Sequence, residues 1–232
     1  MNNDNVPIPR HLGLILDGNR RWAKAKGLPV MEGHRRGFST LKDIVKLVHD
    51  KGIDYLSVYA FSTENWQRSA DEVRNLMKLF LWIAKHETKE LHENGIRFRV
   101  IGSRLRLGKS LVKAIHDAEE LTKDNTRGTL LVCLDYGGQQ EIVEAVKRLA
   151  AEGVKPADIT VESISAHLYE PDVPPVDLII RTSGEERISN FMLWRAAYSE
   201  LIFTPVMWPD FDEAELDRAL DVYATRTRRF GK

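Results

Sequence analysis

The sequence has a single cysteine, no net charge and no long apolar run. Cys133 is the only cysteine in 232 residues, which excludes an intramolecular disulfide and a cysteine-based metal site. The 34 basic and 34 acidic residues cancel, so overall charge gives no attraction to nucleic acid or to an anionic membrane. No segment reaches the roughly 18 consecutive apolar residues of a membrane span. We expect a cytoplasmic protein with no nucleic-acid partner and at most peripheral membrane contact.

Several common catalytic and nucleotide-binding motifs are also missing. No Gly-x-Gly-x-x-Gly follows the first apolar run, and no Gly-x-Ser-x-Gly occurs anywhere. The segment from Gly102 to Ser110 looks like a P-loop, but it has five residues between its glycines where the P-loop has four. These differences argue against a dinucleotide enzyme, a serine hydrolase and an ATP- or GTP-binding enzyme.

Short apolar runs alternate with segments of helical period, which is typical of a parallel sheet with crossover helices. We therefore predict an α/β fold, a single domain with a mostly parallel sheet flanked by helices. It should cover residues 11–232, after a flexible N-terminal segment of residues 1–10, and end in a helix capped by Asp212. The predicted strands are Leu12–Leu16, Tyr55–Phe61, Ile96–Ile101, Thr129–Leu134 and Asp177–Ile180. Two amphipathic helices are marked by Phe38, Leu41, Ile44, Val45 and Val48, and by Ile142, Val143, Val146 and Leu149.

One predicted helix is apolar almost all the way round. Between Leu76 and Ala84 only Lys78 is polar, and such a helix has apolar neighbours on two sides. It either lies between the sheet and another subunit or lines an apolar tunnel for a substrate. The sequence alone favours the first explanation.

Polar side chains gather directly after the first, second and fifth predicted strands. In a parallel sheet these positions share one edge, where ligands bind. They bring five arginines and a carboxylate together at this edge: Arg20, Arg21, Arg68, Arg181, Arg187 and Asp17. Guanidinium groups bind phosphate oxygens in bidentate fashion. The combination suits a polyphosphate bound with Mg²⁺.

Gly18 and Asn19 open a helix, where free backbone N–H groups favour a phosphate. Asp-Gly alone is more often an ordinary turn, so the nearby arginines carry this interpretation. His34 lies near the start of the second helix, where it could meet the same phosphate, although a lone histidine is more often a surface residue.

The motifs together resemble the cis-prenyltransferases, the family of the bacterial undecaprenyl diphosphate synthases, from about His11 to Gly231. The resemblance rests on six segments: His11-x5-Asp17-Gly18-Asn19-x-Arg21-Trp22, Gly33-His34-x-x-Gly37, Tyr59-Ala60-Phe61-Ser62-x-Glu64-Asn65-Trp66-x-Arg68, Asp135-Tyr136-Gly137-Gly138, Asp177-Leu178-Ile179-Ile180-Arg181-Thr182-x-Gly184-Glu185 with Arg187-Ile188-Ser189-Asn190-Phe191, and Trp208-Pro209-Asp210-Phe211.

The resemblance implies a Mg²⁺-dependent homodimeric enzyme. It would condense isopentenyl diphosphate with an allylic diphosphate, such as farnesyl or geranyl diphosphate, into a longer cis-polyprenyl diphosphate, with undecaprenyl diphosphate among the candidate products. Asp17 and Glu200 would hold the metal, Glu200 near the dimer interface, and the apolar helix would line the product tunnel. Asp17 and Asn65 would be the catalytic pair, with Asn65 orienting groups rather than abstracting a proton.

The resemblance also assigns the substrate pockets. The allylic diphosphate would contact Gly18, Asn19, Arg20, Arg21, Trp22 and His34. Isopentenyl diphosphate would contact Arg181, Arg187, Ser189 and the backbone of Ile188. The loop of Ser62, Thr63, Glu64, Asn65, Trp66 and Arg68 would close over the site, and Arg229-Phe230-Gly231 would reach the partner subunit. Val30 stands where many relatives carry a basic residue, and Arg20 is a candidate to replace that diphosphate contact.

Three alternatives remain at this point. A non-catalytic accessory subunit of the same fold should have lost Asp17, Asn65 or the paired arginines, and all are present. A plain polyphosphate- or lipid-phosphate-binding protein would not need Asp17 and Glu200 together. A short-chain Z-farnesyl-type synthase differs only in product length, which the sequence does not determine.

Overall fold

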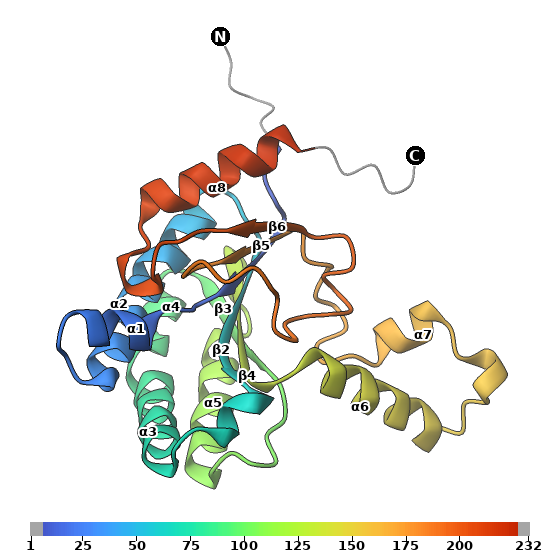
Figure 1. Cartoon of the computed structure of the whole chain (residues 1–232). Coiled ribbons are helices and arrows are strands. Elements are labelled where there is room, and N and C mark those ends of the chain that lie inside the picture. Colours follow the sequence, from blue (N-terminus) through green and yellow to red (C-terminus); the bar gives the residue numbers. More distant parts are fainter. Residues whose placement is uncertain (1–6, 227–232) are drawn as a thin grey trace.

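The structure is a computed structural model that describes residues 7–226, and its centre is a six-stranded sheet (Figure 1). The strand order is β3-β4-β2-β1-β5-β6, and every neighbouring pair is parallel. The strands are β1 His11–Ile15, β2 Tyr55–Ser62, β3 Ile96–Ile101, β4 Gly128–Tyr136, β5 Leu178–Arg181 and β6 Glu200–Phe203. The α-helices are α1 Asn19–Ala25, α2 Val30–Asp50, α3 Ala70–His86, α4 Thr88–Glu93, α5 Lys109–Thr122, α6 Gly138–Ala151, α7 Val161–Ala166 and α8 Glu213–Thr225, and the 3-10 helices are η1 Thr63–Gln67, η2 Pro156–Asp158 and η3 Trp208–Asp210.

The predicted α/β class and all five predicted strands are confirmed, with boundaries within about two residues. β6 is an additional strand at the edge of the sheet, where it pairs with β5 alone. It is as short as β5, but it begins with Glu200 and its four residues are only partly buried. The predicted cap of the last helix is also correct, because the Asp212 carboxylate accepts the backbone N–H of Glu215 at 3.0 Å.

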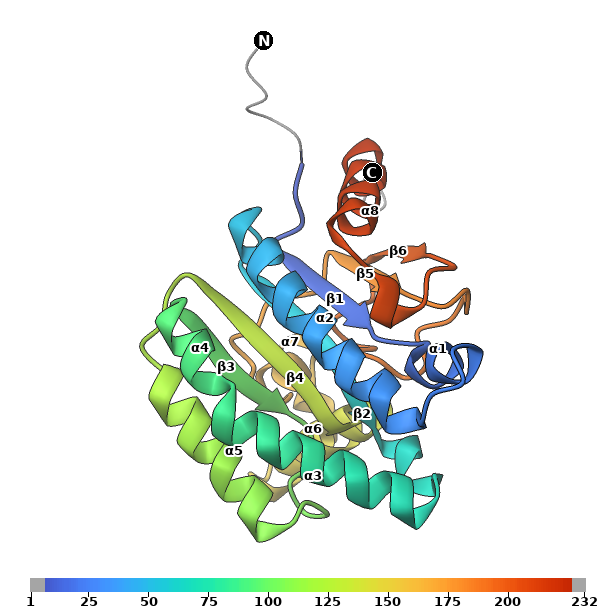
Figure 2. The ribbon, with the colours of Figure 1, turned by 90° about the vertical axis from the view of Figure 1, so that its left-hand side faces the viewer.

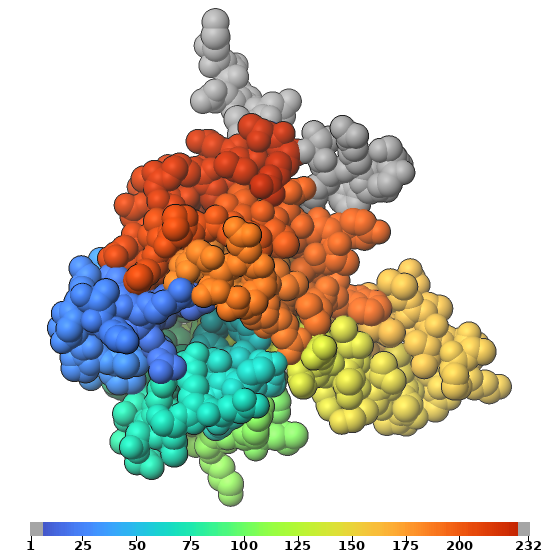
Figure 3. Space-filling view, viewed as in Figure 1, coloured from blue at the N-terminus to red at the C-terminus, as the bar shows by residue number. Residues whose placement is uncertain are grey.

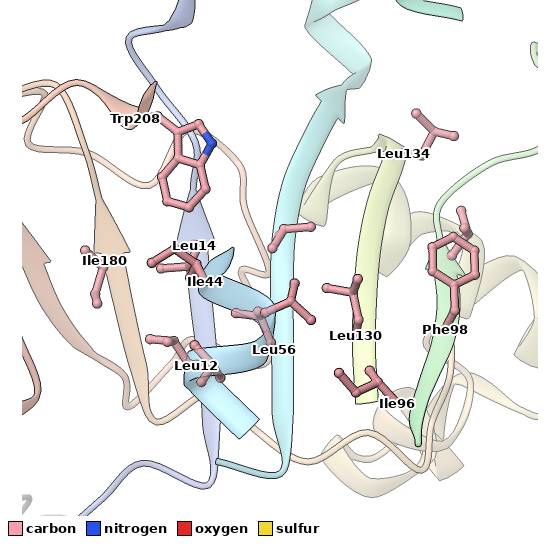
Figure 4. Packing of buried hydrophobic residues seen from close by; sticks show 14 of the residues in the cluster. Leu12, Leu14, Ile44, Leu56, Ile96, Phe98, Leu130, Leu134, Ile180 and Trp208 are labelled. Carbon is pink, nitrogen blue, oxygen red and sulfur yellow. The ribbon is translucent and has the colours of Figure 1, made fainter. Parts of the chain in front are cut away.

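Two apolar layers hold the sheet. One face is covered by α2, α3 and α5, which lie in front of the strands in Figure 2. Figure 4 shows Leu14 and Leu56 of the sheet packed with Ile44 of α2 and with Trp208. The other face is covered mainly by an irregular segment, from which Phe191 and Met192 reach the sheet fully buried. Because both faces are covered, β1 is buried along its whole length.

The predicted apolar face of α6 is partly wrong. Val143 and Val146 are exposed. The helix instead buries Glu141, Ala145 and Leu149, together with Gly138. Glu141 can be buried because Arg195 donates to it at 2.6 Å, both side chains being almost inaccessible to solvent.

Most of the predicted flexible N-terminal segment lies outside the described residues, as does Arg229-Phe230-Gly231. Within residues 7–226, no helix combines the length and apolarity needed to cross a membrane.

Candidate active site

A cavity of about 660 Å³ lies between the sheet and the helices α2, α3 and α4. It starts at the carboxyl ends of the strands, beside Asp17 and Arg181, and continues to Ile96 at the amino end of β3. Figure 3 shows a recess between the segments around α1 (blue), the start of α3 (teal) and the chain after β5 (orange). Charged groups therefore lie at one end of a long interior space.

The body of this cavity is apolar, and α3 supplies much of its wall. Leu76, Leu79, Phe80 and Ile83 line it from this helix, while another side of α3 packs against α5. Within the described chain, a cavity on one side and a helix on another explain most of the apolar pattern of α3, although Trp82 is exposed.

Asp17 and Arg181 form the centre of the charged end. The Arg181 guanidinium is 5% exposed and donates to Asp17 Oδ2 at 2.9 Å. It also donates to Ser189 Oγ at 2.7 Å and to the carbonyl of Arg187 at 2.5 Å. The loops after β1 and β5 are thus joined by one side chain. The predicted meeting of these loops at one sheet edge is correct.

Two glutamates that the sequence analysis did not select organise the remaining arginines. Glu185 lies 3.2 Å from Arg21 and 2.7 Å from Arg187. Glu72 lies 3.1 Å from Arg68 and 3.6 Å from Arg20. The i,i+4 spacing of Arg68 and Glu72 was a possible signal, but Ser69-x-x-Glu72 also matches an ordinary helix cap, and Ser69 does cap α3.

His34 is held against this second cluster by two glycines of α2. A Cβ at Gly33 would lie 2.1 Å from the Asn19 carbonyl oxygen, and one at Gly37 would lie 2.2 Å from Asn19 Oδ1. The glycines therefore allow α2 to approach the start of α1. His34 Nε2 and Asn19 Oδ1 are buried with no hydrogen-bond partner among residues 7–226, and both residues line the cavity. Burial, aided by the charge of Arg68, lowers the pKa of His34 to about 4, so its imidazole is neutral at pH 7.

The loop after β2 forms a 3-10 turn, and Asn65 closes it. Asn65 Oδ1 accepts the backbone N–H of Ser62 at 3.2 Å, and both residues face the cavity. Trp66 Nε1 donates to Asp135 Oδ1 at 2.8 Å, and Arg106 also binds this buried carboxylate. Asp135 has a left-handed backbone, φ 50°. This fixed contact anchors the loop to the end of β4.

The same loop is also tied to the chain after β5. Asn190 Nδ2 donates to Glu64 at 3.0 Å. Asn190 Oδ1 accepts the backbone N–H of Gln139 at 2.8 Å, at the start of α6. Three post-strand loops are therefore held in register by side-chain contacts.

The structure separates some predicted site residues from the cavity. Nine line it directly, namely Asp17, Asn19, His34, Ser62, Glu64, Asn65, Arg68, Arg181 and Ser189. Gly18, Arg20, Arg21, Thr63, Trp66, Arg187 and Ile188 belong to the loops around it and do not line it. Trp22 Nε1 donates to Asp210 at 2.7 Å.

Glu200 lies at the opposite end of the sheet from Asp17. It pairs with Leu178 at the start of β5, whereas Ile15, two residues before Asp17, pairs with Arg181 at its end. Three residues of strand separate these positions by about 10 Å. Glu200 also pairs with Arg226 at 2.8 Å. One chain therefore does not bring the two predicted metal ligands together.

The fit to Mg²⁺ depends on Asp17. Among residues 7–226 no three His, Cys, Asp or Glu side chains form a metal cluster. Mg²⁺ is commonly held by one or two carboxylates together with substrate phosphates and water. Asp17, one-third exposed at the cavity entrance, suits that mode of binding.

Arginines and Asp17 at the mouth of a long apolar cavity suit a molecule with a phosphate head and a hydrocarbon tail. The family model described as "Putative undecaprenyl diphosphate synthase" matches residues 15–231. The chain belongs to this family and is a prenyltransferase, which confirms the resemblance seen in its motifs.

The chain is similar to proteins with related names, and the similarity covers most of each chain. Isoprenyl transferase 2 of Bradyrhizobium diazoefficiens is 49% identical over 98% of this chain and 92% of its own. A trans,polycis-polyprenyl diphosphate synthase of Thermobifida fusca, named as specific for (2Z,6E)-farnesyl diphosphate, is 48% identical over 97% of this chain and 81% of its own. The crystal structure of lavandulyl diphosphate synthase from Lavandula x intermedia, in complex with dimethylallyl diphosphate, superposes with a TM-score of 0.93 at 39% identity, covering 97% of this chain and 99% of that one.

Proposed function

We propose that this protein condenses isopentenyl diphosphate with an allylic diphosphate to give a longer cis-polyprenyl diphosphate. The bond between C1 of the allylic group and its diphosphate breaks, and C1 forms a new bond to C4 of isopentenyl diphosphate. A proton leaves C2 of the isopentenyl unit, and the released diphosphate accepts it. The observation that carries the proposal is the cavity that combines a charged entrance with an apolar body.

The charged entrance suits the step that limits such a reaction, the separation of an anionic diphosphate from an allylic cation. Fixed donors that stabilise charge on the leaving group lower this barrier. We assign this role to Arg20, Arg21, Arg68 and His34, which surround the start of α1 and α2. Arg181, Arg187 and Ser189 would hold isopentenyl diphosphate, because Arg181 donates to Ser189 Oγ and to the backbone carbonyl of Arg187 and so keeps the three residues together.

Three further parts of the proposal concern the metal, the loop and the assembly. Asp17 would hold Mg²⁺, which supplies charge neutralisation for the leaving diphosphate. Asn65 would orient the isopentenyl group, since an amide is a poor base. The protein would act as a cytoplasmic homodimer, in which Glu200 of a second copy could approach Asp17. Exposed Val143, Val146 and Val161 support a partner on the α6–α7 side.

The similar proteins are named for, or crystallised with, isoprenyl diphosphates of different lengths. The Thermobifida protein is named for a polyprenyl product, whereas the lavender protein was crystallised with a five-carbon diphosphate. A short-chain product and a long polyprenyl product such as undecaprenyl diphosphate both suit the entrance site, so length must depend on the cavity itself.

The test is incubation of the purified protein with labelled isopentenyl diphosphate, Mg²⁺ and geranyl or farnesyl diphosphate, followed by chromatography of the dephosphorylated products. Magnesium-dependent incorporation is expected. Asp17→Asn should abolish it, while Asp71→Asn, an exposed acid on α3, should leave it unchanged. Binding of the allylic diphosphate without incorporation would indicate the accessory-subunit or phosphate-binding alternatives instead.

A further inference from the structure

Two lysines of α2 meet two glutamates of the α3–α4 junction at the far end of the cavity. Lys42 Nζ lies 2.6 Å from Glu87 and 2.7 Å from Glu90. Lys46 Nζ lies 2.5 Å from the other oxygen of Glu90. We call these four side chains the distal ion-pair cluster. They connect two helical segments that are 44 and 45 residues apart in sequence.

The distal ion-pair cluster is part of the cavity wall. All four residues line the same cavity as Asp17 and His34. Their side chains are 19% to 43% exposed, so this end of the cavity lies close to solvent. Hydrogen bonds to Glu87 and Glu90 raise the pKa of Lys42, and hydrogen bonds from Lys42 and Lys46 lower the pKa of Glu90. Lys42 and Glu90 therefore stay charged at neutral pH.

The distance from the entrance corresponds to a few isoprene units. His34 and Lys42 are eight residues apart on α2, which is about 12 Å along the helix axis, and Lys46 is about 6 Å further. An extended isoprene unit has four chain bonds of about 1.5 Å and spans roughly 5 Å. A tail that grows from the entrance reaches the cluster after about two to four units.

Growth beyond this point has an energetic obstacle. Before it, each added unit gains stability by entering an apolar wall. At the cluster the tail meets charged, partly exposed groups that join α2 to the α3–α4 junction, in place of a continuous apolar wall. Separating the ion pairs and losing further hydrophobic burial both oppose the next unit.

We propose that the distal ion-pair cluster determines product length by closing the cavity after a few isoprene units. This inference rests on the proposed function and adds to it a specificity device that acts far from the reacting groups. Lys42 has the central position because it contacts both glutamates.

The test compares Lys42→Met, which replaces the charge by an apolar chain of similar length, with Lys42→Arg, which keeps the charge. Lys89→Met is the matched control, because Lys89 pairs with Glu93 on the solvent side of α4 and is 81% exposed. Product distributions are measured with saturating isopentenyl diphosphate. We expect Lys42→Met to lengthen the most abundant product by at least one unit, and both Lys42→Arg and Lys89→Met to leave it unchanged.

A binding experiment separates this inference from the proposed function. Calorimetry measures the affinities of C10, C15 and C20 allylic diphosphates without isopentenyl diphosphate. The ratio of C20 to C15 affinity should rise at least about tenfold in Lys42→Met. This increase is well below the one expected if all five additional carbons were fully buried. A higher ratio of C20 to C15 affinity in Lys42→Met, without turnover by the wild type, would support the role of the cluster and refute the proposed function.

Unchanged product lengths and affinity ratios in an active enzyme would refute the cluster's role and leave the function standing. Absence of any binding by the wild type would refute both. If Lys42→Met does not fold, Lys46→Met and Glu90→Gln give the same comparison, with thermal melting as the check on folding.

Discussion

Gly33→Ala should impair activity far more than stability. The new Cβ would lie 2.1 Å from the Asn19 carbonyl oxygen, whereas carbon–oxygen contacts of this kind are found at about 3.3 Å. The obstacle is backbone, which cannot rotate away, so α2 and α1 must separate by about 1 Å. His34 is the next residue on α2 and moves with it.

The two effects have different sizes. Overpacking costs about 1–3 kcal/mol, but alanine is better than glycine in a helix by about 1 kcal/mol. The net loss of stability is therefore about 1 kcal/mol, or roughly 3 °C in Tm for a chain of this size. A 1 Å displacement of groups that hold the reacting substrate can lower the rate about 100-fold.

The assay is kcat/KM for the allylic diphosphate together with a thermal melt. Gly108→Ala is the control, because a Cβ there meets nothing within 4 Å. If Gly33→Ala keeps more than a third of the wild-type activity, α2 does not need its close approach to Asn19 and the reasoning fails.

Three further predictions concern buried groups. The folded-state pKa of His34, about 4, lies below its unfolded value of 6.5 because the residue is buried. The contribution of His34 to the free energy of unfolding is therefore complete above pH 6.5, and it falls by up to about 3 kcal/mol toward pH 4. Denaturant melts of His34→Gln should show a smaller fall over this range. Arg195→Met leaves the Glu141 carboxylate buried without its charged partner and should destabilise the protein by about 3–5 kcal/mol, whereas the double variant with Glu141→Gln should recover part of this loss. Asp135→Ala releases Trp66 and should lower kcat about tenfold or more, while hydrogen exchange in residues 62–68 accelerates. Asp135→Asn keeps an acceptor for Trp66 and should lower kcat less. Equal effects of the two variants would contradict the anchoring role.

The sequence predicted those parts of the fold and site that depend on local pattern. Buried parallel strands are continuous apolar runs, so β1 to β5 were recognisable. The edge rule for parallel sheets then placed Asp17 and Arg181 together, although they are 164 residues apart. The edge strand β6 was not predicted: it is as short as β5, but it begins with a charged residue and is only partly buried.

Contacts between separate helices were not predictable from spacing. Lys42 and Glu87 meet only because the fold brings α2 and the α3–α4 junction to the same cavity, and nothing in either segment marks this pairing. The exposed valines of α6 show the opposite failure. Periodicity identified a helix correctly, but a buried ion pair at Glu141 fixed which side faces inward.

The pairing of the entrance arginines has a consequence for anion selectivity. Arg21 and Arg187 share Glu185, Arg20 and Arg68 share Glu72, and Arg181 holds Asp17. An incoming anion must exchange with these internal carboxylates rather than neutralise free cations. A singly charged anion with few oxygens gains little from such an exchange, whereas a diphosphate offers several oxygens to several guanidinium groups at once. We therefore expect these carboxylates to compete with phosphate and other small anions for the entrance arginines.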